Sequence, residues 1–467
     1  MRTGPTTSVL LAVAFVLAGW ECFLPSGEQV ASAQTSRRPN VLIFVTDDQR
    51  ATSTMWVLPE TKRNFVRNGV SYPNAFAVTP LCCPSRATIL TGQYAHNHGV
   101  KGNGPPRLGR ATLFPRLLQD AGYRTAMVGK FLNSWRLGRR PPHFDRWASG
   151  GSPYVDPRFN VNGSVRTVNG YSTTLVGRFA GRFLHGLEAN DRAPWLLYVA
   201  PHAPHYPWRP AAQHASRGVG SWSGNPAVLE SDRSDKPPFV RSVFFSLAEG
   251  RSVRAAQLRT LMSVDEVVGR VFAKLRALGE ARRTLAIFTS DNGFLWADHH
   301  LGGTAGTAGQ KRLPYTASVQ IPLLLRWPGH VAAGSRHGRI TGTVDIAPTV
   351  LDAAGIATDS VSPPLDGRSL LSGETRRRIV LEYWRGRVDS WIPNWASLRT
   401  PGFQYVEYYR DGRTFFREYY NLRRDPWQLR NLLHDGTRAN NPDVAALSAR
   451  LRRDRRCAGT MGATACP

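Results

Sequence analysis

Two adjacent cysteines, Cys82 and Cys83, stand directly before a Pro-Ser-Arg sequence that ends at Arg86. The residues that follow are helix-forming and apolar, so the stretch 81–92 predicts a loop that turns into a helix, with Pro84 near its first position. A helix N-terminus offers unpaired N–H groups and a partial positive charge, and Arg86 adds a fixed cation. Cys82 could therefore act as a nucleophile toward an anionic substrate. Taken alone, the pair could also be disulfide partners or buried thiols.

Paired oxygen ligands follow two buried-strand patterns. The apolar run 41–45 predicts a parallel strand buried on both faces, and Asp47 and Asp48 follow its end. A second such pattern ends in Asp291 and Asn292. Neighbouring carboxylates repel each other unless a cation neutralises them, and oxygen ligands suit Ca²⁺ or Mg²⁺. If the two strands are neighbours, both pairs converge on one cation; a lone Asp-Asp pair would instead indicate a solvated turn.

Strand and helix patterns alternate along the rest of the chain. Runs at 123–128 and 195–200 predict further strands, and 254–278 carries apolar residues at near-helical spacing. This order predicts an α/β fold with a largely parallel sheet covered by helices. Lys130 follows the first of these strands, and His202 and His205 follow the second. If it stood alone, Lys130 could be a solvated charge, and either histidine could be a hydrogen-bonded residue of the core.

The run Cys-Cys-Pro-Ser-Arg, with Leu-Thr-Gly at 90–92, resembles the signature of the sulfatase family, whose first signature cysteine is oxidised to formylglycine. That cysteine is Cys82 here. The resemblance implies an alkaline-phosphatase-like fold, hydrolysis of a sulfate ester, and a formylglycine-generating enzyme as a partner. It implies one Ca²⁺ per chain, with ligands from Asp47, Asp48, Cys82, Asp291 and Asn292. It also implies catalytic roles for Cys82, Arg86, Lys130, His205 and Lys311, of which the last lies in a Lys-Arg-Leu-Pro-Tyr run.

The resemblance implies a mechanism in which hydrated formylglycine attacks sulfur and later expels sulfate by re-forming the aldehyde. A tetrahedral sulfate ester needs fixed cations, which Lys130, Lys311 and Arg86 could supply. Arg86 and the metal would lower the pKa of the attacking hydroxyl, and His205 is the candidate proton donor to the leaving oxygen.

One difference between this chain and the arylsulfatase pattern narrows the range of expected substrates. Many arylsulfatases have a histidine two positions after the lysine that matches Lys130, whereas this chain has Leu132 and then Asn133. The base that assists sulfate elimination is therefore unassigned. The run GKFLN, with the His-Asn-His at 96–98, looks like the glucosamine-6-sulfatase and heparan endosulfatase branch. We expect a sulfated sugar or glycosaminoglycan such as N-acetylglucosamine-6-sulfate.

The alternatives are an arylsulfatase, a phosphodiesterase or phosphonate monoester hydrolase on the same scaffold, and a non-catalytic secreted polyanion-binding protein. The 467-residue chain has 60 Lys and Arg against 33 Asp and Glu, a formal net charge of +27, which favours acidic partners. A host-wide preference for arginine would also explain that charge. The sequence contains no nucleic-acid-binding motif, so we expect no nucleic-acid partner.

We expect three segments. Residues 1–33 are typical of a cleaved signal peptide, with a basic residue, a short apolar run and Ala-Ser-Ala at the end, so we expect a secreted or extracellular protein; an uncleaved anchor is the alternative. No other stretch is apolar enough to span a membrane. Residues 34–373 form the catalytic α/β domain, and 374–467 a C-terminal domain with a small antiparallel sheet and a helix. Cys457 and Cys466 could form a disulfide in an oxidising compartment.

Overall fold

The computed structural model describes residues 38–106, 108, 112–189, 193–303, 310–359, 361–386 and 391–467. The predicted signal peptide lies outside the described residues. Within the described part, no helix is both long enough and apolar enough to cross a bilayer.

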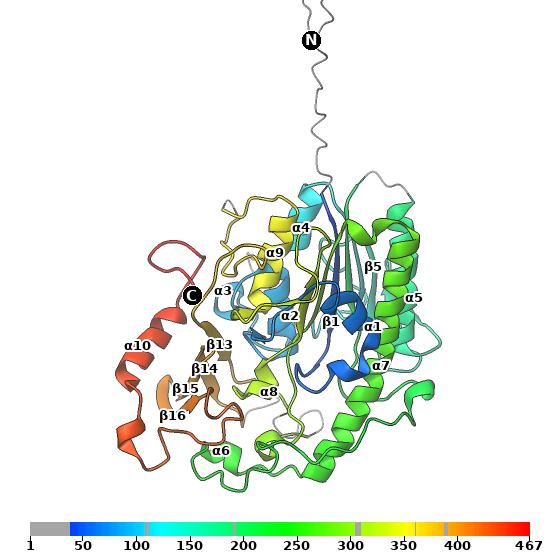
Figure 1. Cartoon of the computed structure of the whole chain (residues 1–467). Coiled ribbons are helices and arrows are strands. Elements are labelled where there is room, and N and C mark those ends of the chain that lie inside the picture. The colour runs from blue at the N-terminus through cyan, green and yellow to red at the C-terminus, as the bar shows by residue number, and fades with distance from the viewer. Residues whose placement is uncertain are drawn as a thin grey trace, which may run out of the picture. The chain divides into compact units, whose positions relative to one another are not determined.

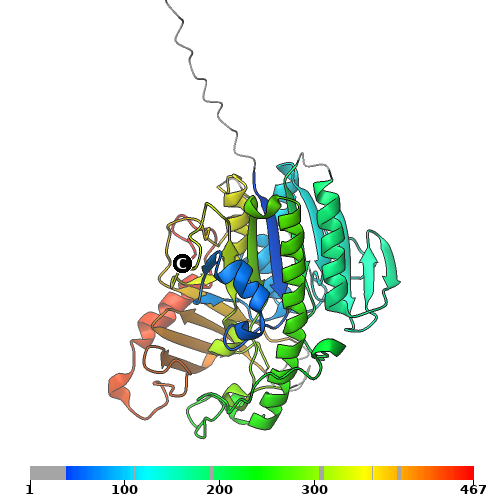
Figure 2. The same cartoon turned by 45° about the vertical axis from the view of Figure 1, so that its right-hand side comes forward.

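A sheet runs through the large part of the molecule (Figures 1 and 2). It has ten strands, in the order β11-β2-β10-β9-β1-β8-β4-β5-β6-β7. Its strands are β1 (Asn40–Thr46), β2 (Val70–Ser71), β4 (Arg124–Gly129), β5 (Arg146–Ser152), β6 (Arg158–Val161), β7 (Ser164–Thr167), β8 (Trp195–Ala200), β9 (Thr284–Ser290), β10 (Leu323–Arg326) and β11 (Ser335–Arg336). The five strands from β9 to β5 are parallel to their neighbours, whereas β10 and β6 run antiparallel to theirs. The predicted, largely parallel sheet is confirmed. Strands β3 (Ala75–Phe76) and β12 (Thr341–Gly342) form a separate short pair.

Helices cover both faces of this sheet. The helices among the described residues are α1 (Pro59–Thr61), α2 (Cys82–Thr91), α3 (Ala95–His98), α4 (Phe114–Asp120), α5 (Ser172–Glu188), α6 (Pro238–Arg241), α7 (Leu247–Ala277), α8 (Thr316–Val319), α9 (Ile346–Ala353) and α10 (Val444–Asp454). Alternate residues of β1 point into two different cores, because side chains of a strand alternate between its faces. Leu42 and Phe44 share a core with α5 and α7. Val41 and Ile43 share the other with α2, α4 and α9.

Four antiparallel strands form a second sheet, in the order β13 (Ile379–Tyr383), β14 (Asn394–Arg399), β15 (Phe403–Arg410) and β16 (Arg413–Asn421). Leu451 of α10 packs against one face of this sheet. The other face shares a core with the segment around Phe76 and Tyr94, next to the start of α2. The small antiparallel sheet and terminal helix are as expected, while the boundary at residue 373 stays a prediction.

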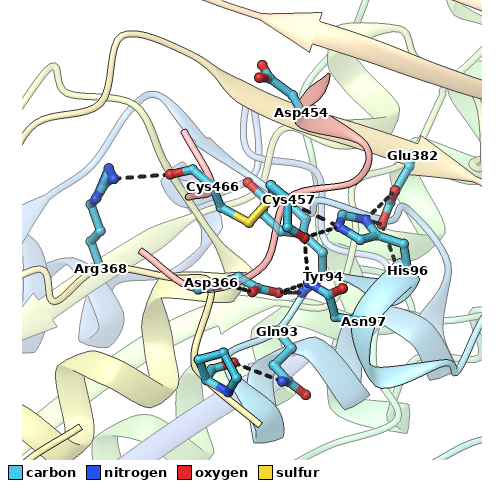
Figure 3. Close-up of a disulfide and its surroundings, with 12 residues drawn as sticks. Gln93, Tyr94, His96, Asn97, Asp366, Arg368, Glu382, Asp454, Cys457 and Cys466 are labelled. Atoms are coloured by element: carbon cyan, nitrogen blue, oxygen red, sulfur yellow. Dashed lines mark hydrogen bonds and ion pairs between the residues drawn. A yellow bond between two sulfur atoms is a disulfide. The ribbon is translucent and has the colours of Figure 1, made fainter. Parts of the chain in front are cut away.

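The predicted disulfide between Cys457 and Cys466 is present, and it closes a loop near the C-terminus. Figure 3 shows this loop held by α3: the Cys457 carbonyl lies 3.1 Å from His96 Nε2 and accepts a hydrogen bond of 2.9 Å from Asn97 Nδ2. The Gly459 N–H donates to Asp366 at 2.8 Å. The C-terminal loop is thereby attached to the segment that follows the Cys82 helix.

Candidate active site

Cys82 is the first residue of α2, as the sequence predicts. Leu81 before it is extended, and Gly92 ends the helix in the left-handed conformation that glycine adopts readily. Cys82 and Arg86 are both fully buried. Helix α2 thus begins at the site and presents Cys82 and, one turn later, Arg86.

The two oxygen-ligand pairs meet because β1 and β9 are adjacent parallel strands with Thr46 opposite Ser290. The Asp48 N–H donates to Asp291 Oδ1 at 3.1 Å, and Asn292 Nδ2 donates to Asp48 Oδ1 at 2.7 Å. Asp48 has a φ of 70°, a left-handed conformation that is uncommon outside glycine. This strained turn directs the carboxylate toward the second pair.

The Cys82 thiol lies among these carboxylates. Its Sγ is 3.5 Å from Asp47 Oδ1 and 3.9 Å from Asp48 Oδ1. Ligand atoms of Asp47, Asp48, Cys82 and His205 all lie within 4.8 Å of one another. Burial raises the pKa of the Cys82 thiol to about 12, with Lys130 opposing the shift. An unmodified thiol would therefore stay protonated at neutral pH and be a poor nucleophile.

Three cations balance the carboxylates: Arg86 and Lys311 are buried, and Lys130 is partly exposed. Arg86 Nε donates to Asp291 Oδ2 at 2.7 Å, and Lys130 Nζ lies 2.5 Å from Asp47 Oδ2. Lys311 Nζ contacts both Asp48 Oδ1 and the Cys82 sulfur. Burial alone would raise the pKa of Asp47, but Lys130 and the other nearby cations hold it well below its usual range. The pKa of Asp291 is raised to about 6 by burial and by the Asp47 charge.

Two histidines lie at the opening of the cluster. His205 Nε2 is 3.8 Å from Asp48 Oδ2, and His202 Nδ1 is 3.6 Å from Asp47 Oδ2. The His205 Nδ1–H donates to the Tyr206 carbonyl at 2.7 Å, which leaves Nε2 facing the site. Burial lowers the pKa of His202 to about 3, so that ring is neutral at physiological pH. The structure therefore brings together the predicted catalytic and metal-ligating residues, and His202, which the sequence placed beside His205, is a neutral neighbour.

The oxygen atoms of the cluster form a donor set that suits a divalent cation. Asp47, Asp48 and Asp291 bring three carboxylates together, and the buried Oδ1 of Asn292 has no hydrogen-bond partner among the residues described. A buried amide oxygen is costly to leave unpaired, and a cation would satisfy it. All of these ligand atoms are oxygens, which suits Ca²⁺. The residues present fit the ion that the sequence predicts.

A cavity of about 290 Å³ lies beside Lys130, His202 and His205 and could admit a substrate. Phe131, Leu132 and Asn133, from the GKFLN run that the sequence analysis singled out, also line it. The remaining lining residues, which no motif marks, are Trp135, Leu137, Ser149, Gly150, Ser152 and Arg158. They come from the loop after β4 and from β5 and β6, and they become neighbours only when these strands pair.

Comparison with known protein families matches the sulfatase family over residues 39–356 and the C-terminal region of N-sulphoglucosamine sulphohydrolase over residues 307–456. The chain belongs to the sulfatase family. It is a sulfuric ester hydrolase, as the signature at Cys82 predicts.

Several relatives of this sulfatase are named as N-acetylglucosamine-6-sulfatases or extracellular sulfatases. N-acetylglucosamine-6-O-sulfatase of Bacteroides thetaiotaomicron is 26% identical over 92% of this chain and 88% of the relative. Human N-acetylglucosamine-6-sulfatase is 27% identical over 86% of this chain and 82% of the relative. The putative extracellular sulfatase Sulf-1 homolog of Caenorhabditis elegans is 34% identical over 75% of this chain, which spans 52% of that protein.

Solved structures share the fold. One, in complex with its substrate D-glucosamine-2-N,6-O-disulfate, superposes with a TM-score of 0.78 at 25% identity, covering 89% of this chain and 97% of the other. Phosphonate monoester hydrolase of Agrobacterium radiobacter gives a TM-score of 0.69 at 23% identity, covering 90% and 96%. The alkaline-phosphatase-like fold is thereby confirmed.

Proposed function

We propose that this sulfatase removes the 6-sulfate of N-acetylglucosamine-6-sulfate or of a closely related sulfated amino sugar. The observation that carries the proposal is the position of Cys82, whose sulfur lies between Asp47 and Lys311 next to a cavity with basic side chains at its edge. The substrate rests on the GKFLN and His-Asn-His runs and on relatives named for N-acetylglucosamine-6-sulfate.

The proposed cofactors are one Ca²⁺ and formylglycine at position 82, installed by a formylglycine-generating enzyme. Asp47, Asp48, Asp291 and Asn292 would hold the ion, which polarises bound oxygen as a Lewis acid. Formylglycine supplies an oxygen nucleophile in place of the protonated thiol. Burial at the start of α2 keeps position 82 away from bulk solvent.

The chain's own residues would bind and orient the ester. Lys130 and Lys311 are positioned to hold the sulfate oxygens, because both ammonium groups lie at the carboxylate cluster and are charge-assisted donors. His205 is the proposed proton donor to the leaving sugar oxygen, because its Nε2 faces the site. It can donate there only as the imidazolium, since Nδ1–H already donates to the Tyr206 carbonyl. Arg86 holds Asp291 in place through Nε, and through Nη1 it bonds the Lys130 carbonyl at 3.0 Å.

We also propose that the protein is exported. The signal-like residues 1–33 support this, and so does the disulfide between Cys457 and Cys466, because disulfides persist in oxidising compartments.

The test combines mass spectrometry of the peptide containing residues 81–86 with a substrate panel, both on protein from its native host. An aldehyde mass at position 82 and preferential hydrolysis of N-acetylglucosamine-6-sulfate are the expected results. The panel includes galactose-6-sulfate, 4-nitrophenyl sulfate and phenyl phosphonate. Faster turnover of the phosphonate would favour a phosphonate monoester hydrolase. An unmodified thiol without turnover would favour a polyanion-binding protein.

A further inference from the structure

A second cavity has a volume of about 340 Å³. Its walls come from the loops after β1 and β9, from α8, and from the C-terminal sheet. The lining residues are Arg50, Thr52, Asn74, Ala227, Leu295, Asp298, His299, Tyr315, Thr316, Ala317, Gln320, Arg399, Pro401, Leu422, Pro426, Trp427 and Gln428. This cavity, here called the Arg399 cavity, contains none of the side chains assigned to sulfate-ester hydrolysis. Its volume is typical of sites for small ligands.

Arg399, the last residue of β14, is buried with 7% of its surface exposed, and no carboxylate is within ion-pair distance of it in the described residues. Its Nη1 donates to Thr316 Oγ1 at 3.0 Å and to Gln404 Oε1 at 2.5 Å. Its Nε is buried and has no acceptor, and Nη2 donates to no side chain or carbonyl in that same part of the chain. The guanidinium also lies over the Phe76 ring, 4.9 Å from the centroid.

A buried charge without a partner is costly, and the cost is removed when an ion of opposite charge binds. Burial alone lowers the pKa of Arg399 to about 9, which reflects the same lack of a partner. The buried Arg86 and Arg376 each have a carboxylate within 3 Å, and the buried Arg254 donates to the Val219 and Gly220 carbonyls. Arg399 differs from all three because it lines a cavity and no carboxylate of the described residues is within ion-pair distance of it.

The other charges that line the cavity are already balanced. Arg50 forms two hydrogen bonds with Asp298, at 2.6 and 3.0 Å. Asp298 accepts further bonds from Asn225 Nδ2 and from the Trp296 N–H, both at 2.9 Å. His299 Nδ1 lies 2.7 Å from Glu230 Oε2. The net charge that faces the Arg399 cavity is consequently positive.

Two aromatic residues add a surface that a sugar ring could contact. Tyr315 is buried in the wall, whereas Trp427 is 37% exposed and also lines the cavity. Apolar lining with a few polar groups that fix orientation is typical of small-molecule sites.

We propose that the Arg399 cavity binds a small oxyanion, a sulfate or carboxylate group that is either free or carried by a sugar. Arg399 supplies the charged contact through Nη2, whereas Nε is enclosed and adds only its charge. Thr316 and Gln404 hold Nη1 and so fix the plane of the guanidinium. The site is independent of the chemistry at Cys82, and its occupant would not be hydrolysed there.

Crystals of the wild-type protein soaked in sodium selenate, a sulfate analogue with an anomalous signal, test the proposal directly. We expect selenium peaks at the catalytic cluster and beside Arg399. A peak at the catalytic cluster alone overturns the Arg399 site, and a peak at Arg399 alone supports it while counting against sulfate binding at Cys82. Parallel soaks with N-acetylglucosamine-6-sulfate and glucuronate distinguish a sugar-borne group from a free ion.

A matched pair of variants tests in solution whether an anion binds beside Arg399 because Arg399 lacks a carboxylate partner. Thr316→Glu places a carboxylate next to Arg399 Nη1, while Thr316→Gln has a similar size and no charge. The melting temperature is measured at increasing concentrations of sodium sulfate. Sodium chloride at equal ionic strength is the control. We expect Thr316→Glu to weaken sulfate binding at this site about tenfold or more, and Thr316→Gln to respond like the wild type. An equal sulfate response in both variants overturns the proposal.

Discussion

Lys311 Nζ lies 2.9 Å from Cys82 Sγ, although the two residues are 229 positions apart in the chain. The same ammonium group contacts Asp48 Oδ1. Lys311 therefore joins the nucleophile position to one of the proposed metal ligands.

Replacing Lys311 with Met should lower kcat/KM for N-acetylglucosamine-6-sulfate about 10²- to 10³-fold, the loss typical of removing one preorganised donor to a developing negative charge. The control is Lys101→Met, because Lys101 is exposed and lies over the Trp384 ring, away from the cluster. Melting temperatures of both variants show whether the lost charge also destabilises the fold. Similar kinetics in the two variants would contradict the assignment.

Cys82 and its neighbour should respond differently to the same substitution. Cys82→Ala should abolish turnover while leaving the fold intact. Cys83→Ala should retain substantial activity at a cost of about 1 kcal/mol in stability, since Cys83 packs in a core and its sulfur faces the Asn133 carbonyl at 3.8 Å. Hydrolysis assays and thermal denaturation check both. Loss of activity in both variants with an intact fold would count against Cys82 as the nucleophile position.

Removing calcium should lower both activity and melting temperature, because three carboxylates and an unpaired amide oxygen converge in a buried site. Asn292→Ala should weaken Ca²⁺ binding by at least about tenfold, as measured by calorimetry on metal-free protein. Asn441→Ala, at an exposed asparagine, serves as the control. Calcium affinity that is unchanged in Asn292→Ala would exclude Asn292 as a ligand.

His205→Gln should lower the hydrolysis rate most for substrates with poor leaving groups. A sugar alcohol needs a proton as it departs, whereas 4-nitrophenolate is a stable anion and needs none. We expect a loss of about 10²-fold or more with N-acetylglucosamine-6-sulfate and a much smaller loss with 4-nitrophenyl sulfate. His185→Gln, at an exposed position of α5, is the control. Equal losses on both substrates would assign His205 to sulfate binding instead of proton transfer.

The catalytic cluster could be predicted because its residues follow strands. The apolar run before Asp47 and the one before Asp291 both indicate buried parallel strands, whose carboxyl ends share one edge of the sheet. The pairing of β1 with β9 then brings Asp48 and Asn292 within hydrogen-bond distance. Family resemblance assigned roles to these residues, and the strand patterns placed them together.

Other features of the structure are not indicated by any local sequence pattern. Helix α7 begins at Leu247, seven residues before the predicted start at Arg254, because Ser246 and Glu249 form a capping box that apolar spacing does not reveal. Strands β5 to β7 contain Gly and exposed polar residues, so no apolar run marks them. Arg399 is an ordinary strand residue in the sequence, and its lack of a carboxylate partner is a property of tertiary packing alone.

Finally, attachment of the C-terminal loop should depend on pH through His96. Its Nδ1 lies 2.9 Å from Glu382 Oε2 and its Nε2 lies 3.1 Å from the Cys457 carbonyl (Figure 3). Both partners are acceptors, so both ring nitrogens donate only in the protonated form. Burial alone would lower the pKa of His96, but the Glu382 charge, with a smaller contribution from Asp366, raises it above its usual value. The neighbouring His98 is buried, and its pKa is lowered to about 3 by burial and by His96, so it stays neutral.

Because the folded-state pKa of His96 is raised, its stabilising effect is complete below the unfolded pKa of about 6.5 and is lost as pH rises through the folded value. The melting temperature of His96→Gln should therefore fall furthest below that of the wild type at pH 6, and the difference should narrow at alkaline pH. Hydrogen exchange of residues 457–466 should show the same trend, since these residues form the loop that His96 holds. A difference between wild type and variant that is constant from pH 6 to 9 would mean that His96 acts through packing against Tyr94, whose ring it stacks on, and that its charge contributes nothing.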